Sequence, residues 1–567
     1  MVALEERDAR LVIGGMSCAG CEATVRMALE RAGASDVRVD FRRGEAWFRL
    51  PREVDPEQLR QAVRAAGYEP GALQVTEPLT SKDRSELPVT PPGSPLRGDG
   101  DGEVPYDLVI IGSGGAAFSA AIQATRHGAR VVMIERGVIG GTCVNIGCVP
   151  SKTLLRAAEI YFRARHHPFA GLDTHAGTVD MSLVIGQKDE LVARLRREKY
   201  ESLIDEYGFD FVHGEARFVD ATTVRAGDRL IRGRAFLIAT GASPAIPDIP
   251  GLREVDFLTS TTALELRRVP ESVAVIGAGY IALEMGQLFR HLGARVTLMQ
   301  RGERLLKAYD PEISAVVARM LAEQGIEVLT GVRYLRVEGG HAGKRVILEV
   351  GGRQRAVEAE ELLVATGRQP NTAALNLDRA GVQVGPRGEV IVDDHLRTTV
   401  PHIYAAGDVT LGPQFVYVAA YQGAVAADNA LGVADRRVDL RVVPRVTFTT
   451  PAIASVGLTE AEARASGHAV RTSVLPLEAV PRALANRETT GVFKLIADAD
   501  TGRLLGAHVV AENAGDVIYA ATLAVKFDLT IQDLQETLCP YLTMAEGLKL
   551  AALTFDVDVS RLSCCAG

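Results

Sequence analysis

The feature that most constrains the fold is a strand–glycine turn–helix pattern that occurs twice. It is carried by YDLVIIGSGGAAFSAAI, starting at Tyr106, and by SVAVIGAGYIALEM, starting at Ser272. In such a G-x-G-x-x-A turn the first glycine permits the tight turn, the second lets the backbone approach a pyrophosphate, and the small third residue lets the helix pack on the strand. The amides at the helix N-terminus then bind phosphate. The sequence therefore predicts an α/β protein with two Rossmann-like nucleotide-binding domains.

The two units differ in the residues at the end of their second strand. After the first turn, at residues 112–117, the next strand ends at Glu135, an acid suited to hydrogen-bond the ribose of a dinucleotide. After the second turn, at residues 277–282, the corresponding strand runs into Gln300 and a basic segment. Cations at this place suit a 2′-phosphate, so the sequence favours NADPH over NADH. These cations are Arg301, Arg304 and Lys307.

A pair of cysteines follows the first nucleotide motif. GGTCVNIGCVPSK places Cys143 and Cys148 just before a helix expected from Ser151. A helix N-terminus lowers the pKa of a nearby thiol and favours the thiolate. Zinc pairs need further ligands, and none is evident near this segment. A dithiol beside two nucleotide domains predicts a relay of electrons from nicotinamide through a flavin to sulfur.

Together with GGTCVNIGCVPSK, two further motifs carry a family resemblance over roughly residues 105–567. They are the ATG triplets at 239–241 and 365–367, and HIYAAGD ending at Asp408. The chain resembles the FAD-dependent pyridine nucleotide–disulfide oxidoreductases. This resemblance implies FAD on the first nucleotide domain, with Lys152 and Asp408 near its isoalloxazine and ribityl groups. It also implies a C-terminal α+β dimerisation domain, and a homodimer whose active sites are shared between subunits.

The same resemblance assigns roles to individual residues. It implies that Cys148 lies against the flavin, that Cys143 meets the substrate, and that Tyr280 covers the flavin until nicotinamide displaces it. The implied FAD-binding residues are Gly112, Gly114, Gly115, Ala117, Glu135, Gly141, Thr142, Lys152, Thr240, Gly241 and Asp408. The implied NADPH-binding residues are Gly277, Gly279, Arg301, Arg304 and Lys307.

The segment near the C-terminus bears on the substrate. Family members that reduce disulfides carry His-Pro-Thr-x-x-Glu there, and the histidine acts with the glutamate as acid–base for the departing thiolate. This chain has YLTMAE instead, with Tyr541 in place of the histidine and Glu546 retained. A phenol with a pKa of about 10 is a poor proton carrier at neutral pH. Disulfide reduction is therefore disfavoured. The nearby Cys539 is predicted to be a small buried residue.

The N-terminal part of the chain predicts a separate metal-binding domain. Residues 9–75 show a βαββαβ order, which indicates an antiparallel sheet with helices on one face. The loop GMSCAGC, with Cys18 and Cys21, resembles that of heavy-metal-associated domains. Two closely spaced thiolates suit a soft ion in near-linear coordination, such as Cu(I) or Hg(II). A stretch rich in Pro, Gly, Ser and charge follows at 77–104, which is typical of a flexible linker.

A third cysteine pair, Cys564 and Cys565, lies close to the end of the chain, where backbone order is usually low. Adjacent cysteines make a strained disulfide, so a dithiol that passes on a thiophilic ion is favoured. The three pairs predict NADPH-dependent two-electron reduction of thiol-bound Hg(II) to Hg(0), in mercury detoxification. The resemblance also implies that Tyr541 of the partner subunit, with Tyr280, lines the Hg(II) site. The predicted metal ligands are Cys18, Cys21, Cys143, Cys148, Cys564 and Cys565.

Two alternatives are consistent with the same motifs. A thioredoxin reductase-like or other flavin disulfide reductase with a C-terminal dithiol tail would need the His-Glu pair that Tyr541 interrupts. A copper-chaperone-type binding module with a passenger core would leave Cys143 and Cys148 dispensable. NADPH oxidation in the presence of mercury or of disulfides separates these hypotheses.

Charge and hydropathy limit partners and location. Lys+Arg 63 against Asp+Glu 71 gives a net charge of −8, which favours neither nucleic acid nor an anionic membrane. The charged start MVALEERDAR and the lack of an apolar run of about 20 residues indicate a cytoplasmic protein without membrane insertion. The expected domains are a heavy-metal-associated domain (1–76), a linker (77–104), an FAD domain (105–260 and 386–440), an NADPH domain (261–385) and a dimerisation domain with the Cys-Cys tail (441–567).

Overall fold

A computed structural model describes residues 6–14, 25–26, 28–30, 32–40, 44–51, 54–76, 105–340, 343–558 and 561. It contains two compact units, Met1–Asp99 and Gly100–Gly567. The predictions for Cys18, Cys21, Cys564 and Cys565 lie outside the described residues. Within the described ranges, every helix is too short or too polar to cross a membrane.

Alternation of apolar and polar residues builds the sheet of the N-terminal unit. In β3 every second side chain is buried, and Phe48 packs in one core with Leu59 and Val63 of α2. The strand order is β2-β3-β1-β4, and each neighbouring pair is antiparallel. Residues 25–26 and 28–30 are helical, so the predicted βαββαβ order is confirmed. The bounds are β1 (Glu6–Gly14), β2 (Ser35–Asp40), β3 (Glu45–Pro51), α2 (Pro56–Ala65) and β4 (Glu69–Thr76).

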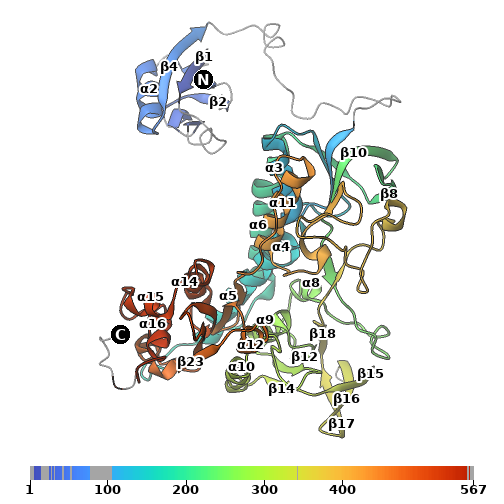
Figure 1. The fold of residues 1–567 in the computed structure, drawn as a ribbon, viewed down its shortest axis with the longest axis vertical. Coiled ribbons are helices and arrows are strands. Elements are labelled where there is room, and N and C mark those ends of the chain that lie inside the picture. The colour runs from blue at the N-terminus through green and yellow to red at the C-terminus, as the bar shows by residue number, and fades with distance from the viewer. Residues whose placement is uncertain are drawn as a thin grey trace. The chain divides into compact units, whose positions relative to one another are not determined.

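The first nucleotide domain is built on a seven-stranded sheet. Strands β7, β6, β5, β10 and β20 run parallel, and β9 and β8 continue the sheet antiparallel. Helix α3 starts at the first glycine turn and packs against α11, which comes from a much later part of the chain (Figure 1). The bounds are β5 (Tyr106–Ile111), α3 (Gly115–Arg126), β6 (Val131–Glu135), β7 (Asp210–His213), β8 (Ala216–Asp220), β9 (Thr223–Ala226), β10 (Arg229–Ile238), β20 (Ile403–Ala405) and α11 (Val416–Ala430).

The cysteine segment forms two successive helices. The expected helix start at Ser151 is wrong, because α5 begins at Cys148 and follows α4 after the single residue Gly147. Further along the chain, a π-helical turn at Arg197–Glu201 separates α6 from α7. The bounds are α4 (Gly141–Ile146), α5 (Cys148–Arg163), α6 (Met181–Arg196) and α7 (Ser202–Tyr207).

The second nucleotide domain contains a four-stranded parallel sheet in the order β14-β13-β12-β18. Helix α9 starts at the second glycine turn, and its long apolar face packs on this sheet and on α5. A three-stranded antiparallel sheet, β15-β16-β17, lies in the chain between β14 and β18. The bounds are α8 (Ser260–Ala263), β12 (Ser272–Ile276), α9 (Tyr280–Leu292), β13 (Arg295–Met299), α10 (Pro311–Glu323), β14 (Glu327–Leu329), β15 (Arg333–Gly340), β16 (Gly343–Val350), β17 (Arg353–Ala359) and β18 (Glu361–Val364).

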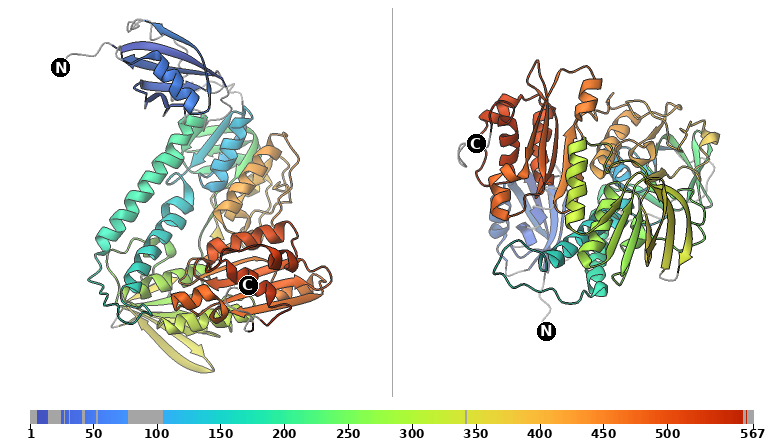
Figure 2. Two further views of the ribbon diagram at one scale, coloured as in Figure 1. Left: turned by 90° about the vertical axis from the view of Figure 1, so that its left-hand side faces the viewer. Right: turned by 90° about the horizontal axis from the view of Figure 1, so that it is seen from below.

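The C-terminal region is the α+β unit that the sequence predicts. Its five-stranded antiparallel sheet has the order β21-β22-β25-β24-β23, with α14 and α16 on one face (Figure 2). Alternate residues of β24 point to opposite faces, so Phe493 contacts α16 whereas Lys494 pairs with Glu312 of α10. The bounds are β21 (Arg445–Thr447), β22 (Ala452–Gly457), α12 (Glu460–Ala465), β23 (Val470–Pro476), α13 (Pro481–Asn486), β24 (Val492–Asp498), β25 (Leu504–Ala511), α14 (Ala514–Lys526), α15 (Ile531–Glu536) and α16 (Glu546–Leu553).

Candidate active site

One cavity gathers most of the residues that the motifs single out, although they come from distant parts of the sequence. The first glycine turn, both cysteine-bearing helices, the ATG triplet at 239–241 and the start of α9 all line it. Ala117 is instead fully buried, in the contact of α3 with its strand, as the motif predicts. The predicted site residues that line the cavity are Gly112, Gly114, Gly115, Glu135, Gly141, Thr142, Cys143, Cys148, Lys152, Thr240, Gly241, Tyr280 and Asp408.

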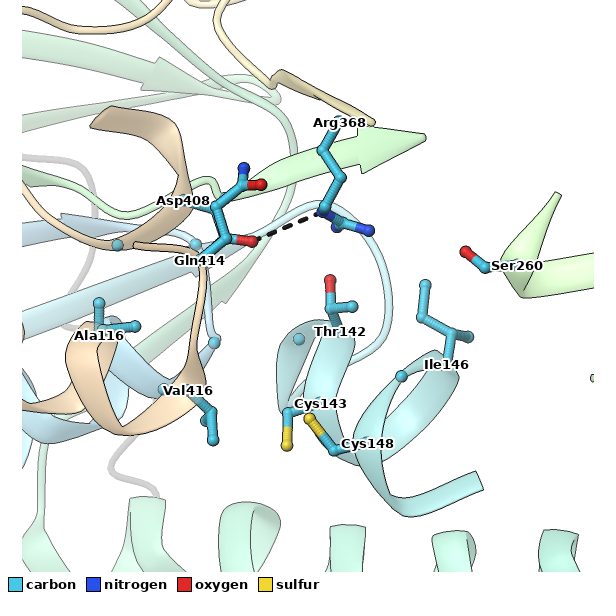
Figure 3. Close-up of a pocket in the computed structure, with 18 of the residues that line it drawn as sticks. Ala116, Thr142, Cys143, Ile146, Cys148, Ser260, Arg368, Asp408, Gln414 and Val416 are labelled. Carbon is cyan, nitrogen blue, oxygen red and sulfur yellow. Dashed lines mark ion pairs between the residues drawn. The ribbon is translucent and has the colours of Figure 1, made fainter. Parts of the chain in front are cut away.

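The two thiols meet inside this cavity. Cys143 lies on α4 and Cys148 is the first residue of α5, and their sulfur atoms point toward each other (Figure 3). A hydrogen bond from Cys143 and the nearby Lys152 ammonium lower the pKa of Cys148 to about 7. The same hydrogen bond and burial raise the pKa of Cys143. Cys148 therefore loses its proton near neutral pH, whereas Cys143 keeps its own.

Lys152 lies one helical turn after Cys148, on the same face of α5. Its Nζ donates a hydrogen bond of 2.7 Å to Oε2 of Glu284. Glu284 lies on α9 of the other nucleotide domain and is only 4% exposed. The ammonium is thus held between the thiol pair and a buried carboxylate.

The first glycine turn has the close backbone approaches that its sequence predicts. Gly112 has φ +108°, and a Cβ there would lie 2.4 Å from the Ala239 carbonyl oxygen. The ATG triplet therefore packs directly on this turn. Glu135 accepts a hydrogen bond of 2.6 Å from the Ser113 hydroxyl and lies on the cavity wall. Gly114 and Gly115 at the N-terminus of α3 line the same cavity, where the helix amides can bind a phosphate.

The opposite wall carries polar groups without hydrogen-bond partners among the described residues. Nε2 of Gln414 and Nε of Arg368 are buried and make no hydrogen bond within the described residues. Nε of Arg368 lies 3.6 Å from the Asp408 carboxylate, as Figure 3 shows. Burial raises the pKa of Asp408, and Arg368 partly offsets this shift. Unpaired donors, a phosphate-type glycine turn and the apolar side chain of Val416 fit the polar and planar parts of FAD.

The second glycine turn repeats this construction. Gly277 has φ +117°, and a Cβ there would lie 2.3 Å from the Ala365 carbonyl oxygen, in the second ATG triplet. Gly279 has no neighbouring atom within 4 Å of the place of a Cβ, so the start of α9 is open to a ligand. Tyr280, the first residue of α9, lines the cavity of the thiols. The turn thus joins the open start of α9 to the dithiol cavity.

The predicted cations follow β13, next to this second turn. Arg301 and Lys307 are exposed, and Nη2 of Arg304 donates to the Lys307 carbonyl at 3.1 Å. Nη1 of Arg304 is buried without a hydrogen-bond partner in the described chain. An unpaired guanidinium nitrogen between two exposed cations fits the 2′-phosphate of NADPH.

Tyr541 and Cys539 lie outside the dithiol cavity of a single chain. Tyr541 is 49% exposed and precedes α16, which begins at Glu546. Burial raises the pKa of Glu546, which accepts a hydrogen bond of 3.3 Å from the Leu542 amide. The expectation that Cys539 is a buried residue is wrong, because it lies half-exposed in the irregular segment before α16.

Comparison with protein families assigns three segments. Residues 106–423 match the pyridine nucleotide-disulphide oxidoreductase family, and residues 443–552 match its dimerisation domain. Residues 10–69 match the heavy-metal-associated domain. These matches confirm the fold class predicted from the sequence.

Curated relatives are similar over the whole chain. A mercuric reductase from Staphylococcus aureus is 58% identical over 564 residues, which is 100% of both chains. One from Streptomyces lividans is 52% identical over 82% of this chain and 98% of its own. This chain belongs to the mercuric reductase family. Mercuric reductases use FAD and NADPH, the two cofactors that the glycine turns and the cavity fit.

Among solved structures, the flavoprotein disulfide reductase RclA from Escherichia coli is 32% identical, with a TM-score of 0.71. The match covers 79% of this chain and 99% of RclA, and RclA has also been solved as a Cu(II) complex. The fold of this chain is therefore shared with a flavoprotein that is named a disulfide reductase.

Three residues that line the cavity were not predicted from the sequence motifs. Glu284 sits inside an apolar helix, whereas Arg368 and Gln414 follow the second ATG triplet and HIYAAGD. A charged residue in the middle of a buried helix face is a usable signal for Glu284, because such a charge needs a partner. Comparable local signals are missing for Arg368 and Gln414.

Proposed function

We propose that this chain catalyses the NADPH-dependent reduction of thiol-bound Hg(II), as the name of its relatives indicates. The balanced reaction is Hg(SR)₂ + NADPH + H⁺ → Hg(0) + NADP⁺ + 2 RSH, in which the metal gains the electron pair of the hydride. The observation that carries the proposal is the hydrogen-bonded Cys143–Cys148 pair in a cavity beside Lys152. Two adjacent sulfurs are the ligands that a soft, two-coordinate cation prefers.

The two thiols differ in a way that suits capture of the metal. Cys143 meets the incoming complex and gives its proton to the thiolate ligand that it displaces, since it keeps that proton until then. Cys148, whose pKa is lowered to about 7, lies against the flavin and supplies the thiolate that displaces the second ligand. Each exchange forms one Hg–S bond and breaks another, so free Hg(II) is never released. The product of two exchanges is Hg(II) held by Cys143 and Cys148.

The remaining cavity residues prepare the site for reduction. When bound, FAD supplies the electron pair that it receives from NADPH. Lys152 provides a fixed positive charge beside the thiol pair, and Glu284 keeps that charge in place. Tyr280 stands at the start of α9, between the open second glycine turn and the dithiol cavity, where it excludes water. Arg301, Arg304 and Lys307 select NADPH through its 2′-phosphate.

Delivery of the metal uses the other cysteine pairs. We assign capture of Hg(II) to Cys18 and Cys21, or to small cellular thiols, and transfer to Cys564 and Cys565 of the partner subunit. Tyr541 of the partner subunit then lines the Hg(II) site together with Tyr280. This assignment is supported by the match of residues 443–552 to a dimerisation domain and by the exposure of Tyr541 outside its own dithiol cavity.

The tyrosine at position 541 also favours a metal over a disulfide as the substrate. A disulfide reductase needs an acid that protonates the departing thiolate near neutral pH, and a phenol of pKa about 10 does this poorly. Reduction of Hg(II) requires no such acid at this position. The reducing state that all three cysteine pairs need is found in the cytoplasm, which we propose as the site of action.

The test is NADPH oxidation by the purified FAD-loaded protein with excess small thiol. HgCl₂, oxidised lipoamide and oxidised thioredoxin are compared as substrates. Stimulation by HgCl₂ with release of elemental mercury vapour is expected. Stimulation by a disulfide, without stimulation by HgCl₂, would refute the proposal.

A further inference from the structure

The Lys152–Glu284 ion pair has a third member that comes from the dimerisation region. The Phe448 ring lies beside the ammonium, with Nζ of Lys152 4.6 Å from the ring centroid. The Phe448 amide donates a hydrogen bond of 2.9 Å to Oε1 of Glu284. Oε2 of the same carboxylate accepts from Lys152. Glu284 is therefore bonded through both oxygens, and Phe448 contacts both members of the pair.

The position of Phe448 is fixed by the backbone that comes directly after it. The Thr450 amide donates to Oε1 of Gln287 at 2.6 Å, and Nε2 of Gln287 donates to the Thr450 carbonyl at 2.9 Å. Gln287 is 1% exposed and lies one turn after Glu284 on α9. Nε2 of Gln324 gives the Thr450 carbonyl a second hydrogen bond, of 2.6 Å. The backbone of residues 448–450 is thus held against α9, which places the Phe448 side chain beside Lys152.

We propose that Phe448 is a positioning residue that holds the Lys152 ammonium in the cavity assigned to FAD. The ring presents its negative face to the cation, while Glu284 binds the cation from another side. This inference rests on the proposed function, because it takes the cavity beside Cys148 as the flavin site. It adds a residue of the dimerisation region, 443–552, to the electrostatics of that site.

A fixed ammonium has a predictable effect on the cofactor. Reduction places negative charge in the cavity, and a cation held there stabilises that charge. Loss of the aromatic face leaves Lys152 more mobile and more hydrated, since its side chain is already 33% exposed. The reduced state of the flavin is then less favoured, so its midpoint potential falls.

The experiment replaces Phe448 by Leu in the full-length FAD-loaded protein. The substitution keeps the backbone amide that binds Glu284 and an apolar side chain, but removes the aromatic face. The ring is 47% exposed, so little core packing is lost. The readout is the midpoint potential of bound FAD, taken from the second two-electron step of an anaerobic dye titration. We expect a shift of about 2- to 5-fold toward oxidised flavin, which corresponds to a potential lower by about 10–20 mV.

Two further variants make the result specific. Phe448→Tyr keeps the aromatic face and is expected to restore the wild-type potential. Phe169→Leu removes a ring that is 42% exposed and 6.0 Å from the Arg487 guanidinium, away from the cavity, and is expected to change nothing. If Phe448→Leu loses FAD on purification, Phe448→Met takes its place in the same titration.

An unchanged or higher potential in Phe448→Leu, or failure of Phe448→Tyr to restore it, would overturn the inference. HgCl₂-dependent NADPH oxidation is measured on the wild-type protein of the same series. Its absence refutes the proposed function. Its presence together with an unchanged potential in Phe448→Leu refutes the role of Phe448 alone.

Discussion

Replacing Lys152 by Met tests the electrostatic origin of the reactive thiolate. Cys148 owes its lowered pKa first to the hydrogen bond from Cys143 and then, against burial, to the Lys152 ammonium. Methionine keeps the length of the side chain and removes its charge. The substitution leaves the Cys143 hydrogen bond in place, so the pKa of Cys148 is expected to rise only part of the way to its ordinary value.

The magnitude can be worked out from the spacing of the two residues on α5. Side chains four apart on a helix lie about 5–6 Å from each other, and a unit charge pair at that distance contributes about 3 kcal/mol at an effective dielectric constant of 20. One third of the Lys152 side chain is exposed, and Glu284 opposes its effect. Solvent screening and this opposition reduce the contribution to about 1.4 kcal/mol, or about one pKa unit.

The sign of the pH dependence is fixed by the direction of the shift. Cys148 is a thiolate above its pKa of about 7. In Lys152→Met the same transition is expected near pH 8, so the thiolate fraction at pH 7 falls from about one half to about one tenth. The pH dependence of iodoacetamide labelling of the NADPH-reduced, metal-free protein measures this, with fragment-ion mass spectrometry to separate Cys148 from Cys143.

The matched control lies on the same helix. Arg156 is another cation of α5, 67% exposed and paired with Glu159 at 2.8 Å. Arg156→Met is expected to leave the labelling profile of Cys148 unchanged. A profile that stays unchanged in Lys152→Met, or moves to lower pH, would show that the ammonium does not lower the pKa of this thiol.

Three further outcomes are expected. Cys148→Ala should abolish the thiolate–flavin absorption band of the reduced protein, whereas Cys539→Ala should retain it; a band that persists without Cys148 would assign the flavin contact to another sulfur. Removal of residues 1–76 should leave much of the turnover on Hg(II) bound to small thiols, and complete loss of turnover would make the N-terminal domain obligatory. Arg301→Ala should raise the KM for NADPH about tenfold, because a hydrogen bond to a charged group contributes about 1.5 kcal/mol, and leave the KM for NADH unchanged; equal effects on both cofactors in steady-state kinetics would contradict recognition of the 2′-phosphate.

Much of the fold could be predicted because its signals are local. The strand–turn–helix units at Gly112 and Gly277 need only neighbouring residues to be recognised, and both form as expected. The C-terminal strands β22 and β23 have weaker local signals, because their formation depends on pairing with β25 and β24. The start of α5 at Cys148 was missed. Pro150 and Ser151 are the third and fourth residues of this helix, whereas proline is most typical of the first helical position.

The candidate site divides in the same way. Cys143, Cys148, Lys152 and Asp408 stand in recognisable motifs, and the structure brings these four residues to one cavity. Glu284, Arg368 and Phe448 join them from segments that carry no motif of this kind. Their roles depend on which helix packs on which strand, and local residue patterns do not encode that choice.

The sequence by itself determined the chemistry available to this protein. Glycine at the turns, paired sulfurs and tyrosine at position 541 supply backbone freedom, soft metal ligands and a weakly acidic phenol, and these follow from the residue types alone. Only the tertiary structure decided which of these groups act together. Lys152 and Glu284 are 132 positions apart, and Lys152 gains its carboxylate and its aromatic neighbour because α5, α9 and the segment after β21 pack at one place. Electrostatic and hydrogen-bond energies depend on distance in space, and folding sets that distance.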